Sequence, residues 1–140
     1  MIYLDASALV TLISGRPYAD ELRDFLAERP GQPMGTSTIG FVETVRTLDR
    51  IGDYPSAMQD LVREFTEILV TEEVRDAAAQ LPAGIRTLDA VHLASAQVVG
   101  PALTALVTYG KRMLEVARDR AAGRGARPRT RSTQVTSSLS

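Results

Sequence analysis

Three acidic residues occupy places in the chain that do not suit a solvated surface. Asp5 ends the apolar run 2–4, Glu43 lies among apolar residues of an expected helix, and Asp89 lies in the first turn of another. Carboxylates that share one site repel one another unless one is protonated or a cation lies between them. Oxygen ligands without cysteine favour Mg²⁺ or Mn²⁺ over Zn²⁺. An ion held in this way activates water and stabilises charge during phosphodiester cleavage.

The segment that carries Asp5 indicates a buried strand followed directly by a helix. Residues 2–4 are apolar, as in a strand covered on both faces, and residues 8–13 form an apolar helical turn and a half. Ser7 has the chemistry of the helix N-cap. The carboxyl end of a buried strand is where open α/β sheets hold their active sites. Structural interpretations remain open: Asp5 could cap the helix together with Ser7, and Glu43 could be a surface residue.

Short apolar segments alternate with helical segments along the rest of the chain. This alternation implies right-handed βαβ crossovers and a parallel sheet between layers of helices. Because strand ends and helix starts meet at one edge of such a sheet, Asp5 and Glu43 should face one crevice, with Asp89 beside them. Further strands are expected at 34–37, 68–70 and 105–109. Helices are expected at 18–28, 39–51, 56–65, 71–81, 86–99 and 111–121, with caps that include Thr71 and Thr87.

Composition indicates one globular, cytoplasmic domain followed by a basic tail. The 140 residues are 44% hydrophobic, which suits a packed core, and they contain no cysteine and no apolar run of 18 residues. No membrane segment or signal peptide is therefore expected. Residues 1–110 carry 15 acidic and 8 basic side chains, whereas residues 111–140 carry 2 acidic and 8 basic ones. An acidic body binds nucleic acid only if cations or a basic segment offset its charge.

The expected domain covers residues 1–122, and the tail covers residues 123–140. The tail mixes arginines with Gly, Pro, Ser and Thr and has few large apolar residues. It cannot bury enough surface to order itself, so we expect it to be disordered. A basic arm that contacts RNA or a partner is the alternative.

The order and spacing of these motifs resemble those of PIN-domain ribonucleases, most closely the VapC toxins of prokaryotic toxin–antitoxin pairs. The resemblance covers residues 1–114 and is carried by Tyr3-Leu4-Asp5-Ala6-Ser7-Ala8-Leu9, by Ser37 and Glu43, by Arg86-Thr87-Leu88-Asp89-Ala90-Val91-His92-Leu93-Ala94, and by Leu106-Val107-Thr108-Tyr109. It implies a three-layer α/β/α sandwich with a short parallel sheet of four or five strands. It also implies a Mg²⁺-dependent endoribonuclease, a homodimer and a VapB-like antitoxin. By motif position, the resemblance makes Asp5, Glu43 and Asp89 the metal-binding acids.

Gly110 stands where the resembled family usually carries a fourth acidic residue. Three carboxylates and one divalent cation leave a charge near −1, so we expect one Mg²⁺ site to remain. The alternative is a PIN fold that has lost catalysis and serves as an antitoxin- or RNA-binding module. A phosphoacceptor receiver domain is disfavoured, because it needs an aspartate at the end of the third strand and this chain has Thr71 there. The arginine-rich tail also replaces the family's last strand.

His92 and several arginines are further candidates. His92 is the only histidine and lies three residues after Asp89, on the same helical face. We expect a buried, hydrogen-bonded side chain that fixes its helix against the sheet, with a catalytic base as the alternative. The candidates for phosphate contacts are Arg46, Arg86, Lys111 and Arg112.

Overall fold

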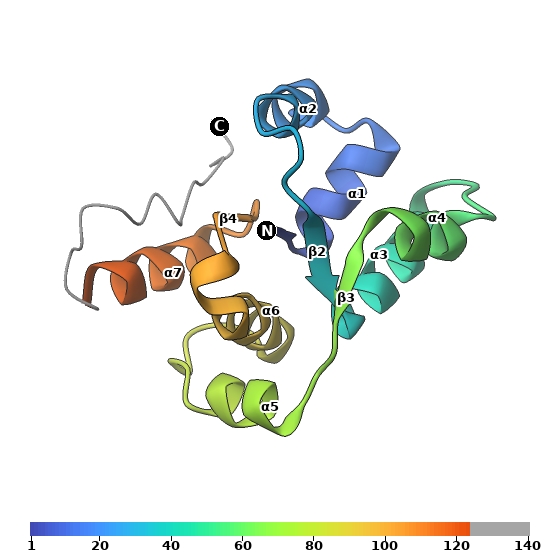
Figure 1. The fold of residues 1–140 in the computed structure, drawn as a ribbon. Coiled ribbons are helices and arrows are strands. Elements are labelled where there is room, and N and C mark those ends of the chain that lie inside the picture. Colours follow the sequence, from blue (N-terminus) through green and yellow to red (C-terminus); the bar gives the residue numbers. More distant parts are fainter. Residues whose placement is uncertain (124–140) are drawn as a thin grey trace.

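Four short strands form one parallel sheet in the computed structural model, which describes residues 1–123 (Figure 1). The strands are β1 (Ile2–Leu4), β2 (Met34–Ser37), β3 (Thr66–Ile68) and β4 (Ala105–Val107), in the order β3-β2-β1-β4. All three pairings are parallel. The predicted parallel α/β sheet is confirmed, with four strands among the described residues. The expectation of a disordered tail falls on residues that lie almost entirely outside this range.

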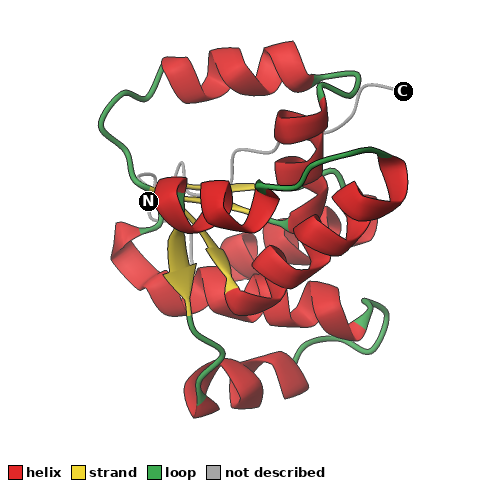
Figure 2. Cartoon of the chain, turned by 90° about the vertical axis from the view of Figure 1, so that its right-hand side faces the viewer, coloured by secondary structure: helices red, strands yellow, loops and turns green. Residues whose placement is uncertain are grey.

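Seven described α-helices surround the sheet, and Figure 2 shows helices on all sides of the strands. No helix among residues 1–123 is long and apolar enough to span a bilayer. A short 3₁₀ turn, η1 (Gly100–Ala102), precedes β4. The helices are α1 (Ala6–Ser14), α2 (Ala19–Ala27), α3 (Thr38–Ile51), α4 (Ala57–Glu64), α5 (Glu72–Ala79), α6 (Thr87–Val99) and α7 (Lys111–Gly123).

Alternating side chains of the central strands divide the core into two layers. Tyr3 and Leu106 point into the layer made with α5, α6 and α7. Their neighbours Ile2, Leu4 and Val107 point into the layer made with α1 to α4. Because both faces of the sheet are covered, β1 and β4 are apolar throughout and fully buried. This arrangement is the predicted α/β/α sandwich.

The third strand differs from its prediction. The apolar run 68–70 suggested the strand, but β3 is Thr66–Ile68 and pairs with Gly35 to Ser37 of β2. Since β2 ends at Ser37, where α3 begins, Leu69 has no partner to extend the ladder. Leu69 and the next residue, Val70, are therefore exposed, with 62% and 42% of their surface accessible.

Candidate functional site

Asp5 lies at the carboxyl end of β1, and three donors hold its buried carboxyl group. Oδ1 accepts hydrogen bonds from the Ala8 amide at 3.0 Å and the Ser7 hydroxyl at 2.6 Å. Oδ2 accepts one from the Thr108 hydroxyl at 2.5 Å. Asp5 itself is the N-cap of α1, so the prediction that Ser7 caps this helix is wrong. Ser7 lies within the first turn, where its hydroxyl is close enough to donate to the capping carboxylate.

Burial of Asp5 governs its protonation. Only 4% of the residue is exposed. Desolvation by burial raises the pKa of the Asp5 carboxyl group, and the hydrogen bonds from Ser7 and Thr108 and the proximity of His92 oppose that rise only in part. Ionisation of Asp5 is therefore unfavourable in free energy, and a cation beside the carboxylate would offset that free energy.

Glu43 extends from α3 toward α6 and meets His92. The distance from His92 Nε2 to Glu43 Oε1 is 2.9 Å, and the distance from His92 Nδ1 to the Tyr3 hydroxyl is 2.6 Å. His92 is 1% exposed and Tyr3 is fully buried. Burial raises the pKa of Tyr3 to about 12, so its hydroxyl keeps its proton at neutral pH. The expectation that His92 is a buried, hydrogen-bonded residue is confirmed.

Asp89 lies in the first turn of α6 and is more accessible than Asp5. Its side chain is 22% exposed, and its Oδ2 atom lies 3.3 Å from Nε of Arg86. Arg86, not Thr87, occupies the N-cap position of α6, and no side chain caps the helix end, so the cap prediction for Thr87 is wrong. Asp89 is one helical turn before His92, which places it on the side of α6 that approaches α3 and β1.

The three acids do not form a ready-made metal site. Within residues 1–123, no three Asp, Glu or His side chains are grouped so that they could hold one ion. Glu43 contacts His92, Asp89 contacts Arg86, and Asp5 is held by its own three donors. The donor chemistry nevertheless fits a hard divalent cation, since all the acids offer oxygen and burial makes the ionised form of Asp5 unfavourable without a positive charge beside it.

Gly110 lies next to this site. Its backbone N–H donates to the Thr108 hydroxyl at 3.0 Å, and its carbonyl oxygen accepts from Leu114, so Gly110 precedes the first turn of α7. A Cβ atom at Gly110 would lie 3.4 Å from the Thr108 hydroxyl oxygen and 3.7 Å from Cβ of Met113. These are ordinary contacts. The position therefore has room for a Cβ atom beside the Thr108 hydroxyl, which donates to Asp5.

Two residues of the site were not predicted. Thr108 is fully buried and binds Asp5 directly, and Tyr3 contacts His92 from within β1. Thr108 could have been found from its place, because it is a polar residue directly after a buried strand that pairs with β1. In the sequence Tyr3 is one residue of the apolar run 2–4, so no comparable pattern indicates its contact with His92.

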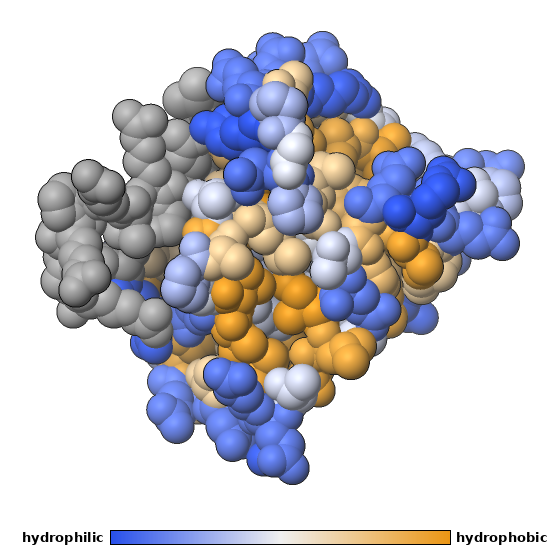
Figure 3. All heavy atoms as spheres, viewed as in Figure 1, coloured by the Kyte–Doolittle hydropathy of each residue, from blue (hydrophilic) through white to orange (hydrophobic). Residues whose placement is uncertain are grey.

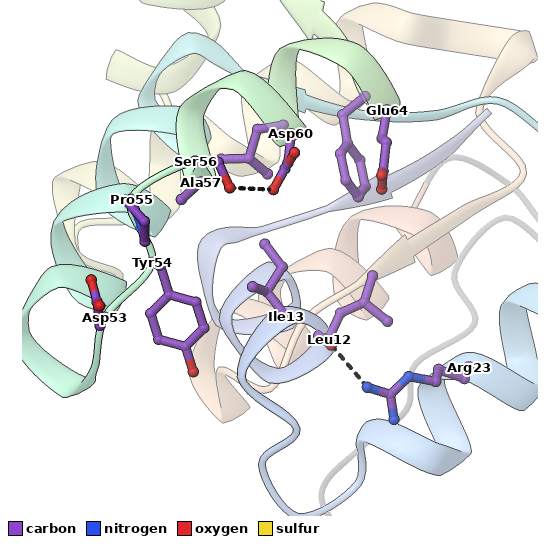
Figure 4. Close-up of a pocket in the computed structure, with 12 residues that line it drawn as sticks. Leu12, Ile13, Arg23, Asp53, Tyr54, Pro55, Ser56, Ala57, Asp60 and Glu64 are labelled. Atoms are coloured by element: carbon purple, nitrogen blue, oxygen red, sulfur yellow. Dashed lines mark hydrogen bonds between the residues drawn. The ribbon is translucent and has the colours of Figure 1, made fainter.

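A cavity of about 500 Å³ lies elsewhere, between α1, α2 and α4 (Figure 4). Apolar side chains that include Leu12, Ile13 and Phe65 line it, and acidic side chains stand at its rim. None of Asp5, Glu43 and Asp89 lines this cavity. The cavity and the carboxyl edge of the sheet are therefore two separate features. The rim acids are Asp53, Asp60 and Glu64.

Residues 2–119 match the PIN domain family. Ribonuclease VapC47 of Mycobacterium tuberculosis (strain CDC 1551 / Oshkosh) is 39% identical over 124 residues, which are 85% of this chain and 91% of the relative. Ribonuclease VapC35 of the same strain is 37% identical over 121 residues, which are 84% and 90% of the two chains.

Two solved structures share the fold. The crystal structure of Mycobacterium tuberculosis VapC20, described as a sarcin–ricin loop cleaving toxin, matches with a TM-score of 0.66 and 19% identity over 88% of this chain and 95% of that one. A toxin–antitoxin complex from Klebsiella pneumoniae matches with a TM-score of 0.63 and 21% identity over 81% and 90% of the chains. Together with the sequence relatives, these findings exclude the receiver-domain alternative. The chain belongs to the PIN domain family, among the VapC proteins.

Proposed function

We propose that this protein is the toxin of a type II toxin–antitoxin pair and an endoribonuclease that cleaves RNA phosphodiesters in the cytoplasm. The relatives named ribonuclease VapC support this proposal. The observation of the structure that carries it is Asp5, a buried carboxyl group with a raised pKa at the carboxyl end of a central strand. A buried acid of this kind at that edge is typical of a catalytic centre.

Asp5, Glu43 and Asp89 would hold Mg²⁺, or Mn²⁺, in the active protein. When bound, the ion supplies a more acidic water and offsets the charge that develops on the phosphate. The protein's own residues prepare for this chemistry. Hydrogen bonds from Ser7, Ala8 and Thr108 fix the direction of the Asp5 carboxyl group. The exposed Arg86 side chain would contact the RNA backbone after its ion pair with Asp89 breaks.

A catalytically impaired PIN fold that only binds antitoxin or RNA is the second candidate. Gly110 favours it, because one carboxylate of the family's set is absent while the space for it remains. Comparing the protein with a Gly110→Asp variant separates the two candidates. Cleavage by the protein as it stands supports an active toxin, whereas cleavage by the variant alone supports the impaired fold.

The partners of the proposed toxin are a VapB-like antitoxin and a second copy of the chain. The apolar cavity between α1, α2 and α4 would accommodate apolar side chains of an antitoxin segment. Exposed apolar residues support self-association, and Figure 3 shows an apolar area over α6 and the segment that leads from β3 toward α5. These residues include Val42, Leu69, Val70 and Leu88. Measuring the mass of the purified protein by light scattering checks the dimer.

An RNA cleavage assay tests the proposed function. The protein is stripped with EDTA and incubated with a structured RNA, with and without Mg²⁺. We expect cleavage only with Mg²⁺, and we expect it to be lost in Asp5→Asn. Asp49→Asn, which changes an exposed acid of α3, serves as the matched control and should cleave like the unmodified protein. Cleavage by Asp5→Asn at the unmodified rate would contradict the assignment.

A further inference from the structure

One line of buried polar groups connects β1 to Glu43 through α6. The backbone N–H of Ser37 lies 3.3 Å from the Tyr3 hydroxyl oxygen, and that hydroxyl lies 2.6 Å from His92 Nδ1. The opposite ring nitrogen of His92, Nε2, lies 2.9 Å from Glu43 Oε1. Tyr3 and His92 are both buried on the α6 side of the sheet. Buried polar groups of this kind are costly unless each is matched with a partner.

The donors and acceptors in this line favour one proton arrangement. The Ser37 amide can only donate, so the Tyr3 oxygen accepts there and uses its own proton toward His92. His92 Nδ1 then accepts, which leaves the proton of a neutral imidazole on Nε2. Nε2–H points at Glu43, a carboxylate that can only accept when ionised. In this arrangement each of the three hydrogen bonds has one donor and one acceptor, and all three run from Ser37 toward Glu43.

Glu43 depends on this contact for its position. Its side chain is 29% exposed, and within residues 1–123 His92 provides the one hydrogen bond that reaches it. A free glutamate side chain samples several rotamers, and fixing it costs conformational entropy. A hydrogen bond to a charged acceptor is among the stronger ones in proteins, so this contact selects one rotamer.

We infer that His92 is a positioning residue that orients Glu43 through its Nε2–H, and that the Tyr3 hydroxyl sets the tautomer of His92. The inference rests on the proposed function, which makes Glu43 a metal ligand. Asp5 needs no such help, because its carboxyl group is fixed by its own helix cap and by Thr108. His92 does not act as a base toward RNA, since its ring is 1% exposed and both nitrogens have partners.

Nitrogen-15 NMR of the histidine ring tests the tautomer in the unmodified, metal-free protein. Because His92 is the only histidine, its two ring nitrogens give the only imidazole signals. We expect Nε2 to carry the proton and Nδ1 to be bare at neutral pH. A ring protonated on Nδ1, alone or together with Nε2, would overturn the inference. This readout requires neither a variant nor catalytic activity.

Two variants of His92 test the orientation of Glu43. A glutamine amide reaches the place of Nε2, whereas an asparagine amide reaches only the place of Nδ1. His92→Gln should therefore keep the contact to Glu43, and His92→Asn should lose it while keeping a partner for Tyr3. We expect His92→Asn to weaken Mn²⁺ binding, measured by calorimetry on stripped protein, about tenfold or more, and His92→Gln to weaken it by less than about threefold.

The outcomes separate this inference from the proposed function. If the unmodified protein binds Mn²⁺ and the two variants differ as expected, the inference stands even if no RNA is cleaved. If the protein cleaves RNA but both variants bind Mn²⁺ like the unmodified protein, the inference is overturned and the proposed function survives. Absence of Mn²⁺ binding to the unmodified protein also overturns the inference. Should His92→Asn fail to fold, the NMR result decides.

Discussion

Asp5, at the carboxyl end of β1, and Asp89, in the first turn of α6, have opposite surroundings. Asp5 is 4% exposed and accepts three hydrogen bonds from its own cap and from Thr108. The Asp89 side chain is 22% exposed, and its one hydrogen-bond or ion-pair partner within residues 1–123 is the guanidinium group of Arg86, whose side chain is 89% exposed. One acid is fixed by the fold, and the other is held by a surface ion pair. The proposed metal-binding set therefore combines a rigid member, Asp5, with an adjustable one, Asp89.

The energies of these contacts support that distinction. A hydrogen bond to a charged group contributes about 1.5–3 kcal/mol, and a buried group left unpaired costs a similar amount. An exposed ion pair contributes about 0–1 kcal/mol. Moving Asp5 would break several strong contacts, whereas moving Asp89 would break one weak contact. We therefore expect Asp89, and not Asp5, to shift when an ion gathers the three carboxylates.

The largest expected effect comes from truncating each of these acids. Asp5→Ala and Asp89→Ala should each lower RNA cleavage at least about a hundredfold, because each removes a proposed ligand. Their stabilities should differ. Asp5→Ala leaves the Ala8 N–H and the proton of the Thr108 hydroxyl without an acceptor and should cost about 1–3 kcal/mol of unfolding free energy, measured by urea unfolding. Asp89→Ala should stay within about 1 kcal/mol, and a larger loss would contradict the distinction.

Tyr3→Phe should produce the next largest effect, on stability and its dependence on pH. The change leaves His92 Nδ1 and the Ser37 amide without their partner, at a cost of about 1–3 kcal/mol at neutral pH. The pKa of Tyr3 is raised from 10.0 to about 12, so the unfolded chain releases this proton first. The stability that Tyr3 contributes is present below pH 10 and is lost as the pH rises toward 12.

Urea unfolding between pH 9 and about pH 12, with EDTA present, checks this prediction. The unmodified protein should lose stability over that range more steeply than Tyr3→Phe does. Tyr54→Phe, at the rim of the cavity, is the control and should follow the steep profile. Parallel profiles for the unmodified protein and Tyr3→Phe would show that Tyr3 is not the buried group described.

Gly110→Asp should moderately increase the affinity for Mg²⁺, whereas the preceding variants lose activity or stability. A Cβ atom fits at Gly110, and the aspartate adds a negative charge near Asp5, so affinity for Mg²⁺ should rise by about tenfold, or about 1.4 kcal/mol. Calorimetric titration with Mg²⁺ measures this change. Gly110→Asn is the matched control with similar shape and no charge. Equal Mg²⁺ affinity of the two variants would remove the electrostatic explanation.

The smallest expected effect is that of Arg86→Ala. The Arg86–Asp89 pair is exposed on the arginine side, so stability should change by less than about 1 kcal/mol. Thermal or urea unfolding measures this change. A loss of unfolding free energy comparable to that of Asp5→Ala would show that Asp89 is held as firmly as Asp5. That result would contradict the distinction between a rigid and an adjustable acid.

The sequence predicted the parts of this protein that depend on local pattern. The apolar run 2–4, the cap at Thr71 and the order of strands and helices follow from periodicity and turn chemistry, and all are found in the structure. The pairing partners of a strand are a tertiary property. The prediction of β3 from the apolar run 68–70 was therefore wrong in position, because the hydrogen-bonded ladder between β2 and β3 stops where β2 ends.

The sequence named Asp5, Glu43, Asp89 and His92 as candidates, but it did not indicate Thr108, Tyr3 or the arrangement of the site. Asp5 could be recognised because an acid ends a buried strand, and His92 could be recognised as buried because of its apolar helix. The cap of α1 could not be assigned, since both Asp5 and Ser7 have suitable side chains and only the backbone geometry selects Asp5. The link from Tyr3 to Glu43 joins segments far apart in the chain, so no local pattern reveals it.

The location of a bound ion tests the central claim most directly. Crystals grown with Mn²⁺ would show the ion by its anomalous scattering. We predict one ion bound to the Asp5 carboxylate, with Glu43 and Asp89 as further ligands and with Asp89 displaced from Arg86. No bound ion, or an ion held only by the acids at the cavity rim, would contradict a metal centre at the carboxyl edge of the sheet.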